Sequence, residues 1–306
     1  MASLKNLKNE YLEYLEIERN RAQKTLENYG RYLERFVQFA KSDSLSAISE
    51  DSIRQYRLHL NRMRDRDGQP LKKVTQNYHI IALRNFLKYL AKRQITSVAA
   101  ERVELGKQED RQVSFLEQDE LVRLVSAPTG TELPSLRDKA LLQMLFSTGM
   151  RVSEICSMNR DSVGLERGEV SVRGKGGKIR PVFLSNEARD ILATYVSKRP
   201  DVDDALFIRI PKNGKFNKAD DLRLTPRSIQ RIVKKYSIKA GIVSKHVSPH
   251  TLRHSYATDL LRNGADIRSV QAMLGHSSVT TTQIYTHVTD KGLREVHERF
   301  HNKRKN

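Results

Sequence analysis

Helical periodicity runs through most of this chain, and one short stretch alternates like a β-strand instead. In the first hundred residues apolar side chains recur three and four positions apart, a pattern typical of amphipathic helices. Between residues 169 and 184, EVSVRGKGGKIRPVFL, apolar residues alternate on both sides of a glycine-rich turn, which predicts a β-hairpin. We therefore expect a mainly α fold with a small antiparallel β-sheet. The expected N-terminal helices span residues 9–19, 25–41, 53–63 and 74–93.

The stretch 98–113 differs in character from the segments on either side of it. It is polar and charged with weak periodicity, as linkers between domains commonly are. We predict a helical domain over residues 1–97, a linker over 98–113 and a second domain over 114–306. Ser114 and Glu117 have the spacing of a capping box and predict a helix start there. Further helices are expected over 137–146, over 226–238 and from Pro249 to Asn263.

The charge balance of the chain is strongly basic. Lys and Arg number 55 against 36 Asp and Glu, giving a formal net charge of +19 that is spread along the whole sequence. Such an excess attracts polyanions, and DNA, RNA and acidic membrane surfaces all qualify. No run approaches the length of a membrane span, and the charged N-terminus lacks the apolar core of a secretory signal. We expect a cytoplasmic protein with an extended basic surface that binds nucleic acid.

The single cysteine, Cys156, lies in an apolar-periodic run. One thiol forms neither an internal disulfide nor a structural zinc site, so a packing role is expected. The chain has no Walker A sequence, and its motifs lack the carboxylate cluster that a two-metal nuclease needs. We expect neither a metal nor any other cofactor.

The motif STGMRVSEI, residues 147–155, places an arginine at a helix start. Gly149 is expected to end one helix and Arg151 to begin the next. A guanidinium in that position donates two hydrogen bonds to a phosphate, and Glu154, one turn later, is expected to hold it in place. A surface salt bridge without function is the alternative interpretation.

The motif SPHTLRHS, residues 248–255, opens another helix. Ser248 is expected to cap it, and His250 and Arg253 then lie three residues apart on one face near its N-terminus. That end of a helix favours anions, so a histidine and an arginine there suit a phosphodiester. The pattern H-x-x-R alone occurs often by chance.

The motif LGHSSVTTTQIYTHV, residues 274–288, contains a candidate nucleophile. Gly275 is expected to end a helix, His276 follows it, and Tyr285 lies on a short helix beyond. A tyrosine hydroxyl attacks phosphorus when its proton is removed and the phosphate charge is neutralised. Ordinary packing is the alternative, as for most of the eleven tyrosines.

The hairpin tip RGKGGK carries two lysines. Glycines on both sides of Lys175 allow the backbone to approach DNA closely, and a lysine there donates a proton or binds phosphate. Lys178 is the competing candidate for that role. Further residues expected to contact the DNA backbone are Lys72 and Lys73, in the basic loop between the third and fourth helices, and Arg173 and Arg180 in the hairpin.

In order and spacing these motifs resemble the tyrosine recombinase (phage integrase) family, and within it the Xer branch. The resemblance covers nearly the whole chain, including the N-terminal run TLENYGRYLERF. It implies a helical core-binding domain and a catalytic domain that clamp duplex DNA, and the GKGGK tip favours Lys175 over Lys178. The active-site residues that it implies are Arg151, Lys175, His250, Arg253, His276 and Tyr285.

The reaction expected of this set is phosphoryl transfer to Tyr285. The two arginines, Arg151 and Arg253, neutralise the non-bridging oxygens, and Lys175 protonates the departing 5′-oxygen. His250 accepts the tyrosine proton or hydrogen-bonds the phosphate, and His276 helps to orient it. The 3′-phosphotyrosyl bond keeps the energy of the broken bond, so rejoining needs no ATP.

The resemblance also implies an assembly. Four protomers, identical or of two kinds, are expected to exchange strands between two DNA sites, with the tail 290–306 docked on a neighbour. A helix folded back on its own domain is the alternative for that tail. Expected roles are chromosome or plasmid dimer resolution, or integration and excision of a mobile element. Two other functions stay open: relaxation of DNA by a type IB topoisomerase, and a non-catalytic DNA-binding regulator.

Overall fold

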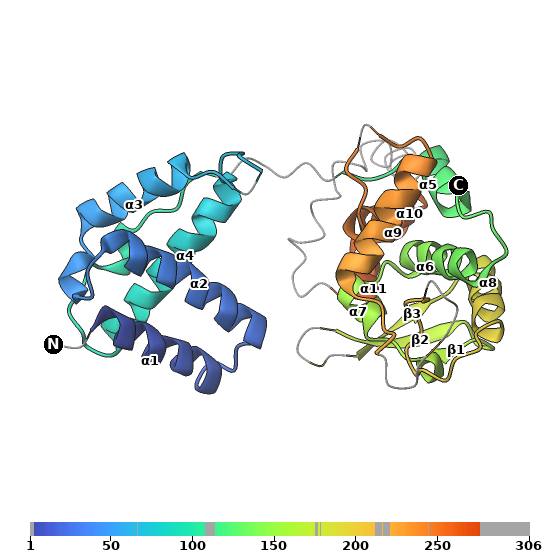
Figure 1. Cartoon of the computed structure of the whole chain (residues 1–306), viewed down its shortest axis with the longest axis horizontal. Coiled ribbons are helices and arrows are strands. Elements are labelled where there is room, and N and C mark those ends of the chain that lie inside the picture. The colour runs from blue at the N-terminus through green and yellow to red at the C-terminus, as the bar shows by residue number, and fades with distance from the viewer. Residues whose placement is uncertain are drawn as a thin grey trace, which may run out of the picture. The chain divides into compact units, whose positions relative to one another are not determined.

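The computed structural model divides into two compact units, Met1–Asp110 and Arg111–Asn306 (Figure 1). The division falls inside the stretch expected to be the linker. The residues described are 3–65, 67–107, 114–174, 177, 179–211, 216, 221–243 and 245–275. Outside them lie Lys175, Lys178, His276, Tyr285 and the tail 290–306, and of Arg173 only the backbone is described.

Four amphipathic helices build the first unit around an aromatic-rich core, as their apolar periodicity predicts. The rings of Tyr11 and Phe86 lie 5.5 Å apart, centre to centre, and those of Phe36 and Tyr56 lie 5.1 Å apart. The first helix begins earlier than expected because the Ser3 hydroxyl accepts a hydrogen bond from the Asn6 backbone N–H. The elements are α1 (Leu4–Ile17), α2 (Gln23–Ala40), η1 (Leu45–Ala47), α3 (Glu50–Arg62), α4 (Lys73–Lys92) and η2 (Ala100–Arg102).

The first unit continues into the segment that was expected to be linker from residue 98. Ala100 and Val103 are buried in the helical core. The buried Asn77 amide of α4 donates to the Gly106 carbonyl at 2.8 Å and accepts from the Gly106 N–H at 3.0 Å. The expected linker therefore starts too early. The few apolar side chains of this segment that reach the core, Val98, Ala100 and Val103, are too few to produce a periodic pattern.

The second unit contains a three-stranded antiparallel sheet in the order β1-β2-β3. The expected hairpin is confirmed, with Val170 paired to Val182 and Val172 to Arg180. Alternation along the strands places Val170, Val172 and Val182 in the core. The additional strand, β1, has only two residues and therefore leaves no alternating pattern in the sequence. The strands are β1 (Val163–Gly164), β2 (Glu169–Arg173) and β3 (Ile179–Phe183).

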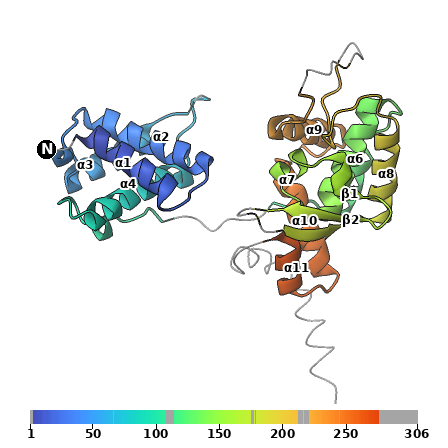
Figure 2. The same cartoon turned by 90° about the horizontal axis from the view of Figure 1, so that it is seen from below.

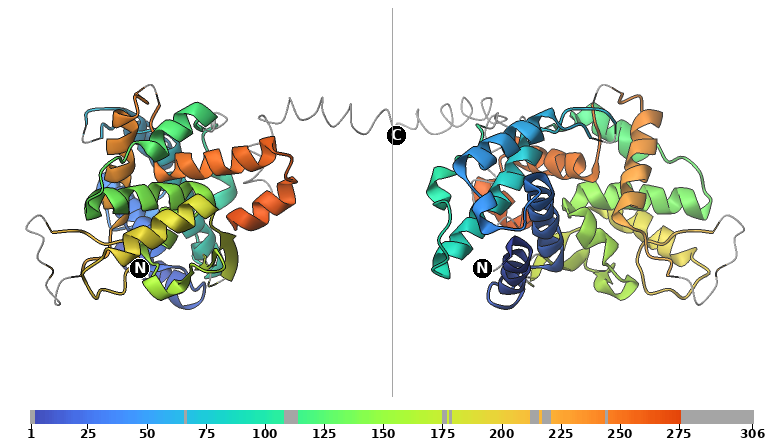
Figure 3. Two further views of the ribbon diagram at one scale, coloured as in Figure 1. Left: turned by 90° about the vertical axis from the view of Figure 1, so that its right-hand side faces the viewer. Right: turned by 60° about the vertical axis from the view of Figure 1, so that its left-hand side comes forward.

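The helices of the second unit surround α6, whose leucines Leu141, Leu142 and Leu145 are fully buried. Helix α8 runs alongside α6 (Figure 3). Figure 2 shows α11 next to α10. The mainly α fold with a small antiparallel sheet is thus confirmed. The helices are α5 (Gln118–Ser126), α6 (Leu133–Thr148), α7 (Val152–Cys156), η3 (Arg160–Ser162), α8 (Asn186–Ser197), α9 (Pro226–Lys239), α10 (Pro249–Arg262) and α11 (Ile267–Leu274).

Helix α5 begins later than its sequence suggested. Its N-cap is Glu117, which forms a capping box with Glu120, so the prediction of a start at Ser114 is wrong. The reason is tertiary: Leu116 is buried, and its N–H donates to the Ser255 hydroxyl of α10 at 2.9 Å. Among the described residues, no helix is long and apolar enough to cross a membrane.

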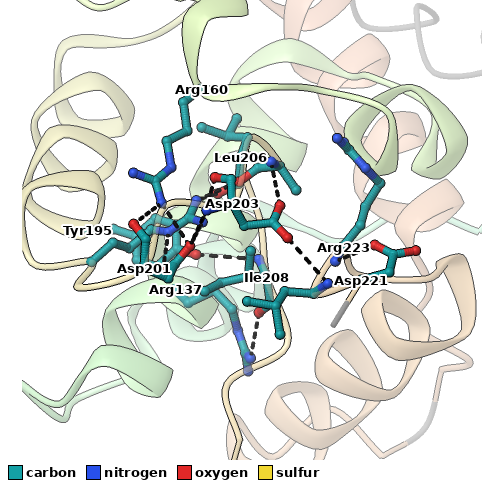
Figure 4. Close-up of polar contacts among 12 residues, drawn as sticks. Arg137, Arg160, Tyr195, Asp201, Asp203, Leu206, Ile208, Asp221 and Arg223 are labelled. Carbon is teal, nitrogen blue, oxygen red and sulfur yellow. Dashed lines mark hydrogen bonds and ion pairs between the residues drawn. The ribbon is translucent and has the colours of Figure 1, made fainter. Parts of the chain in front are cut away.

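A buried ion-pair network fixes the segment after α8 (Figure 4). The Asp201 carboxylate accepts from Arg199 Nε at 3.0 Å and from Arg160 at 2.8 Å, and Arg199 also donates to the Leu206 carbonyl at 3.0 Å. Burial raises the pKa of Asp201, but the bonds from Arg199 outweigh it and leave the pKa below its ordinary value. The segment is held by charge-assisted hydrogen bonds rather than by apolar packing alone.

Replacing Asp201 by Asn should strongly destabilise the protein, because it leaves the buried Arg199 without its carboxylate. We expect the free energy of unfolding in urea to fall by about 3–5 kcal/mol. The difference should shrink as the pH falls below the usual carboxyl range, because acid protonates Asp201 in the wild type too. Asp190→Asn, in an exposed pair with Arg189, should cost less than about 1 kcal/mol. Equal losses in the two variants would contradict the prediction.

Candidate active site

Helix α7 presents Arg151 at its N-terminus, as the sequence predicts. Gly149 adopts a left-handed conformation, with φ of 56°, and ends α6. Arg151 is the N-cap residue of α7, and Glu154 lies one turn later. The Glu154 carboxylate accepts from the Arg151 backbone N–H at 2.8 Å and from its guanidinium at 2.9 Å. The contact expected from this spacing is therefore present, and it orients the guanidinium.

The Glu154 carboxylate also binds a second arginine, which comes from the hairpin. Arg180 of β3 donates from its two terminal nitrogens to both carboxylate oxygens, at 3.0 and 2.8 Å. Burial raises the pKa of Glu154, but the hydrogen bonds from Arg180 and Arg151 outweigh it and lower the pKa below its usual value. Glu154 is therefore ionised at neutral pH, and two guanidinium groups share its charge.

Helix α10 presents His250 and Arg253. The Ser248 hydroxyl caps this helix by accepting from the Thr251 N–H at 3.3 Å, and Pro249 occupies the first turn. His250 is exposed, whereas Arg253 is 3% exposed. The Arg253 guanidinium donates to the Gly149 carbonyl at 2.6 Å and to the Leu274 carbonyl at 2.6 Å. One buried arginine thus joins the ends of α6 and α11.

The three arginines converge on the C-terminal end of α11. Arg180 donates to the Met273 carbonyl at 3.0 Å, Arg253 to that of Leu274 at 2.6 Å and Arg151 to that of Gly275 at 3.1 Å. The last carbonyls of a helix lack helical partners and carry partial negative charge, so they attract cations. Three guanidiniums therefore lie beside the residue that precedes His276.

Gly275 is required at this junction for two reasons. It ends α11 in a left-handed conformation, with φ of 63°. A Cβ atom at this position would also lie 3.0 Å from the Arg180 Cδ atom. The chain thus turns at a position where a side chain would displace Arg180.

The arrangement suits an anion. Three guanidiniums against one carboxylate leave an excess of positive charge, and the Arg151 side chain retains 31% exposure through which a phosphate oxygen can be reached. Within the described ranges, no group of three or more His, Cys, Asp or Glu residues is placed to hold a metal ion. Burial raises the pKa of Cys156 to about 11, so its side chain remains a thiol at neutral pH.

Of the expected site residues, Arg151 and Arg253 meet at the end of α11. Arg180 was expected to contact the DNA backbone, yet its side chain is 11% exposed and is bonded to Glu154 and Met273 within the protein. The sequence does indicate that Arg180 lies inside the protein. It is two residues from the buried Val182, and a charge on the core face of a strand needs an internal partner.

The lysines expected to bind DNA in the first unit are exposed. Lys72 is the N-cap residue of α4, and the Lys73 ammonium donates to the Asn61 side chain at 2.9 Å. The preceding loop is ordered by Asp65, whose carboxylate accepts from the Gln69 N–H at 2.9 Å. Both lysines remain candidates for DNA contact.

Sequence reasoning missed Arg223. Its guanidinium donates to the carbonyls of Cys156 at 3.0 Å and Met158 at 2.8 Å, and to the Asn159 side chain at 2.6 Å. These bonds fix the C-terminal end of α7, whose five residues are too few to form a stable helix alone. No motif surrounds Arg223, so the sequence offers no signal for this role.

Comparison with known proteins identifies the family. The phage integrase family profile matches residues 114–292, and that of its N-terminal SAM-like domain matches residues 9–94. The chain belongs to the phage integrase family. It is 36% identical to tyrosine recombinase XerD of Oceanobacillus iheyensis, over 95% of this chain and 97% of that protein. It is also 36% identical to tyrosine recombinase XerC of Bacillus subtilis, over 98% of both.

The solved structure of a site-specific recombinase has the same fold. It is the XerH site-specific recombinase bound to a palindromic difH substrate after cleavage, with 25% sequence identity and a TM-score of 0.71. The match covers 93% of this chain and 82% of that chain. The expected resemblance to tyrosine recombinases of the Xer branch is therefore confirmed.

Gly149→Ala should lower the free energy of unfolding more than the same substitution at another glycine with positive φ. Both Gly149 and Gly264 have positive φ, which costs a residue with a Cβ about 1–2 kcal/mol. A Cβ on Gly149 would in addition lie 2.3 Å from the Tyr256 ring, whereas one on Gly264 would meet open space.

We expect Gly149→Ala to lose more unfolding free energy in urea than Gly264→Ala. It should also slow DNA cleavage, because the Gly149 carbonyl that binds Arg253 must shift. Equal stability and equal cleavage rates for the two variants would refute this role of Gly149.

Proposed function

We propose that this chain is a site-specific DNA recombinase that cleaves DNA with Tyr285 and forms a 3′-phosphotyrosyl intermediate. The observation that carries the proposal is the meeting of Arg151 and Arg253 at the end of α11. Its relatives are named tyrosine recombinases, and one similar structure is a recombinase bound to its DNA substrate. These relatives favour strand exchange over the relaxation activity of a type IB topoisomerase.

The proposed reaction uses six side chains in separate roles. Tyr285 attacks the phosphorus, and Arg151 and Arg253 stabilise the charge that builds on the non-bridging oxygens. His250 accepts the tyrosine proton or hydrogen-bonds the phosphate, and His276 helps to orient it. Lys175 protonates the 5′-oxygen as it leaves. The P–O bond to the 5′-oxygen breaks as the bond to Tyr285 forms, so the bond energy is kept and rejoining needs no ATP. The two arginines supply the positive charge that a metal ion would otherwise provide.

The proposed partner is double-stranded DNA. A net charge of +19 provides long-range attraction to it, and Lys72, Lys73, Arg173 and Lys178 are proposed backbone contacts. Four protomers, of one or two kinds, are proposed to act on two DNA sites, with each tail 290–306 docked on a neighbour. The site of action is nucleoid DNA in the cytoplasm. The role is dimer resolution or the movement of a mobile element.

Tyr285→Phe should abolish covalent attachment to DNA while leaving DNA binding intact, because it removes only the attacking oxygen. The substrate is a duplex selected by binding from a random-sequence pool and nicked beside the cleavage point, so that the adduct is trapped. Tyr256→Phe is the matched control and should form the adduct, since burial raises the pKa of Tyr256 and disfavours its ionisation. An adduct with Phe at position 285 would exclude Tyr285 as the nucleophile.

Lys175→Ala should cleave normal DNA about a hundredfold to ten-thousandfold more slowly, because an alkoxide leaves poorly without a proton. Replacing the 5′-bridging oxygen by sulfur removes this need, so Lys175→Ala should then cleave at nearly the wild-type rate. Arg151→Ala should not be rescued, because it stabilises the non-bridging oxygens. Rescue of Lys178→Ala instead of Lys175→Ala would move the role to Lys178, and rescue of neither would remove it from the hairpin.

A further inference from the structure

Arg180 is placed inside the protein by the register of the sheet. It pairs with the buried Val172 on β2 and shares its face of β3 with the buried Val182. The neighbouring Ile179 and Phe183, on the opposite face, are 66% and 46% exposed. A guanidinium directed toward a core must find hydrogen-bond acceptors there.

The acceptors that Arg180 finds belong to two segments of the site. Its terminal nitrogens bind both oxygens of Glu154, and its Nε–H binds the Met273 carbonyl at 3.0 Å. Glu154 in turn binds Arg151, and Met273 lies two residues before the Gly275 carbonyl that Arg151 also reaches. One side chain thus ties the hairpin strand to α7 and to the end of α11.

We propose that Arg180 is a positioning residue for strand cleavage, which holds Arg151 and the end of α11 in place relative to strand β3. The proposal rests on the proposed function of the chain. Arg180 acts through Glu154 and Met273 and does not contact the DNA. Only arginine meets the geometry, because its planar fork binds both carboxylate oxygens while Nε points to a third acceptor.

The charge state of Glu154 is the link between Arg180 and Arg151. Four N–H bonds to its carboxylate come from these two residues, two from each. Without Arg180, only the bonds from Arg151 would oppose the effect of burial, so the pKa of Glu154 would be higher than in the wild type. In acid the carboxyl would then be protonated, and it would bind the Arg151 guanidinium less strongly.

Other titratable groups near the end of α11 do not replace this link. On α10, Arg253 is bonded to the carbonyls of Gly149 and Leu274. The Tyr256 hydroxyl, on the same helix, has a pKa raised by burial and stays neutral in the acidic range. The pH dependence introduced by loss of Arg180 should therefore report on Glu154.

The test compares Arg180→Met and Arg180→Lys with the wild type on the selected duplex. We expect cleavage to slow by about a hundredfold in Arg180→Met, the loss typical of a displaced catalytic group. The acid limb of the rate–pH profile should move to higher pH. Dissociation constants and their salt dependence should stay at wild-type values. Arg180→Lys keeps the positive charge but loses the planar fork, so its acid limb should shift in the same direction but by less.

Arg189→Met is the control for the loss of one positive charge, because Arg189 is an arginine of α8 whose pair with Asp190 is exposed. It should cleave with the wild-type rate and pH profile. Adding Glu154→Gln to Arg180→Met should remove the shift of the acid limb, since no titrating group then remains at position 154.

Two outcomes would overturn the proposal. The first is wild-type cleavage and pH dependence in Arg180→Met. The second is weaker DNA binding with a salt slope reduced by about 0.9, which marks a lost phosphate contact. If Arg180→Met unfolds at the assay temperature, the pH profile of Arg180→Lys decides. Failure of the wild type itself to form an adduct would instead reject the proposed function.

Discussion

The Glu154 carboxylate is buried between two guanidiniums, and the geometry of the site depends on its remaining ionised. An isolated carboxylate at 5% exposure would take up a proton to avoid the cost of desolvation. The bonds from Arg180 and Arg151 reverse that preference and lower its pKa. The same carboxylate orients Arg151. The hydrogen bonds that keep Glu154 ionised therefore also hold Arg151 in place.

The C-terminal end of α11 is the second feature that organises the site, and its geometry depends on the Glu154 carboxylate. Its last carbonyls accept from Arg180, Arg253 and Arg151, which come from β3, α10 and the start of α7. Segments far apart in the sequence are thereby fixed to one helix terminus. Such preorganisation matters for phosphoryl transfer, because groups already in place need not reorganise as charge develops.

The sequence was most informative where local physics sets the structure. The glycine stop at Gly149, the Ser248 cap and the alternating hairpin all form as expected. It was less informative where a tertiary contact decides. The start of α5 depends on a bond from Leu116 to Ser255, and Gly106 is anchored by the distant Asn77. The internal position of Arg180 follows from strand register, but its partner Glu154 is 26 residues away and becomes visible only in the fold.

The balance of charges explains why the proposed phosphodiester site includes a carboxylate. Three guanidiniums packed at one helix end repel one another, and helix carbonyls offset only part of that repulsion. Glu154 neutralises the charge of the buried Arg180 and leaves the partly exposed Arg151 anchored but still cationic. The positive charge that reaches the surface is then concentrated where a substrate phosphate can use it. Replacing Glu154 by a neutral residue would leave the largely buried Arg180 without a counter-charge, so the carboxylate stabilises the fold as well as orienting Arg151.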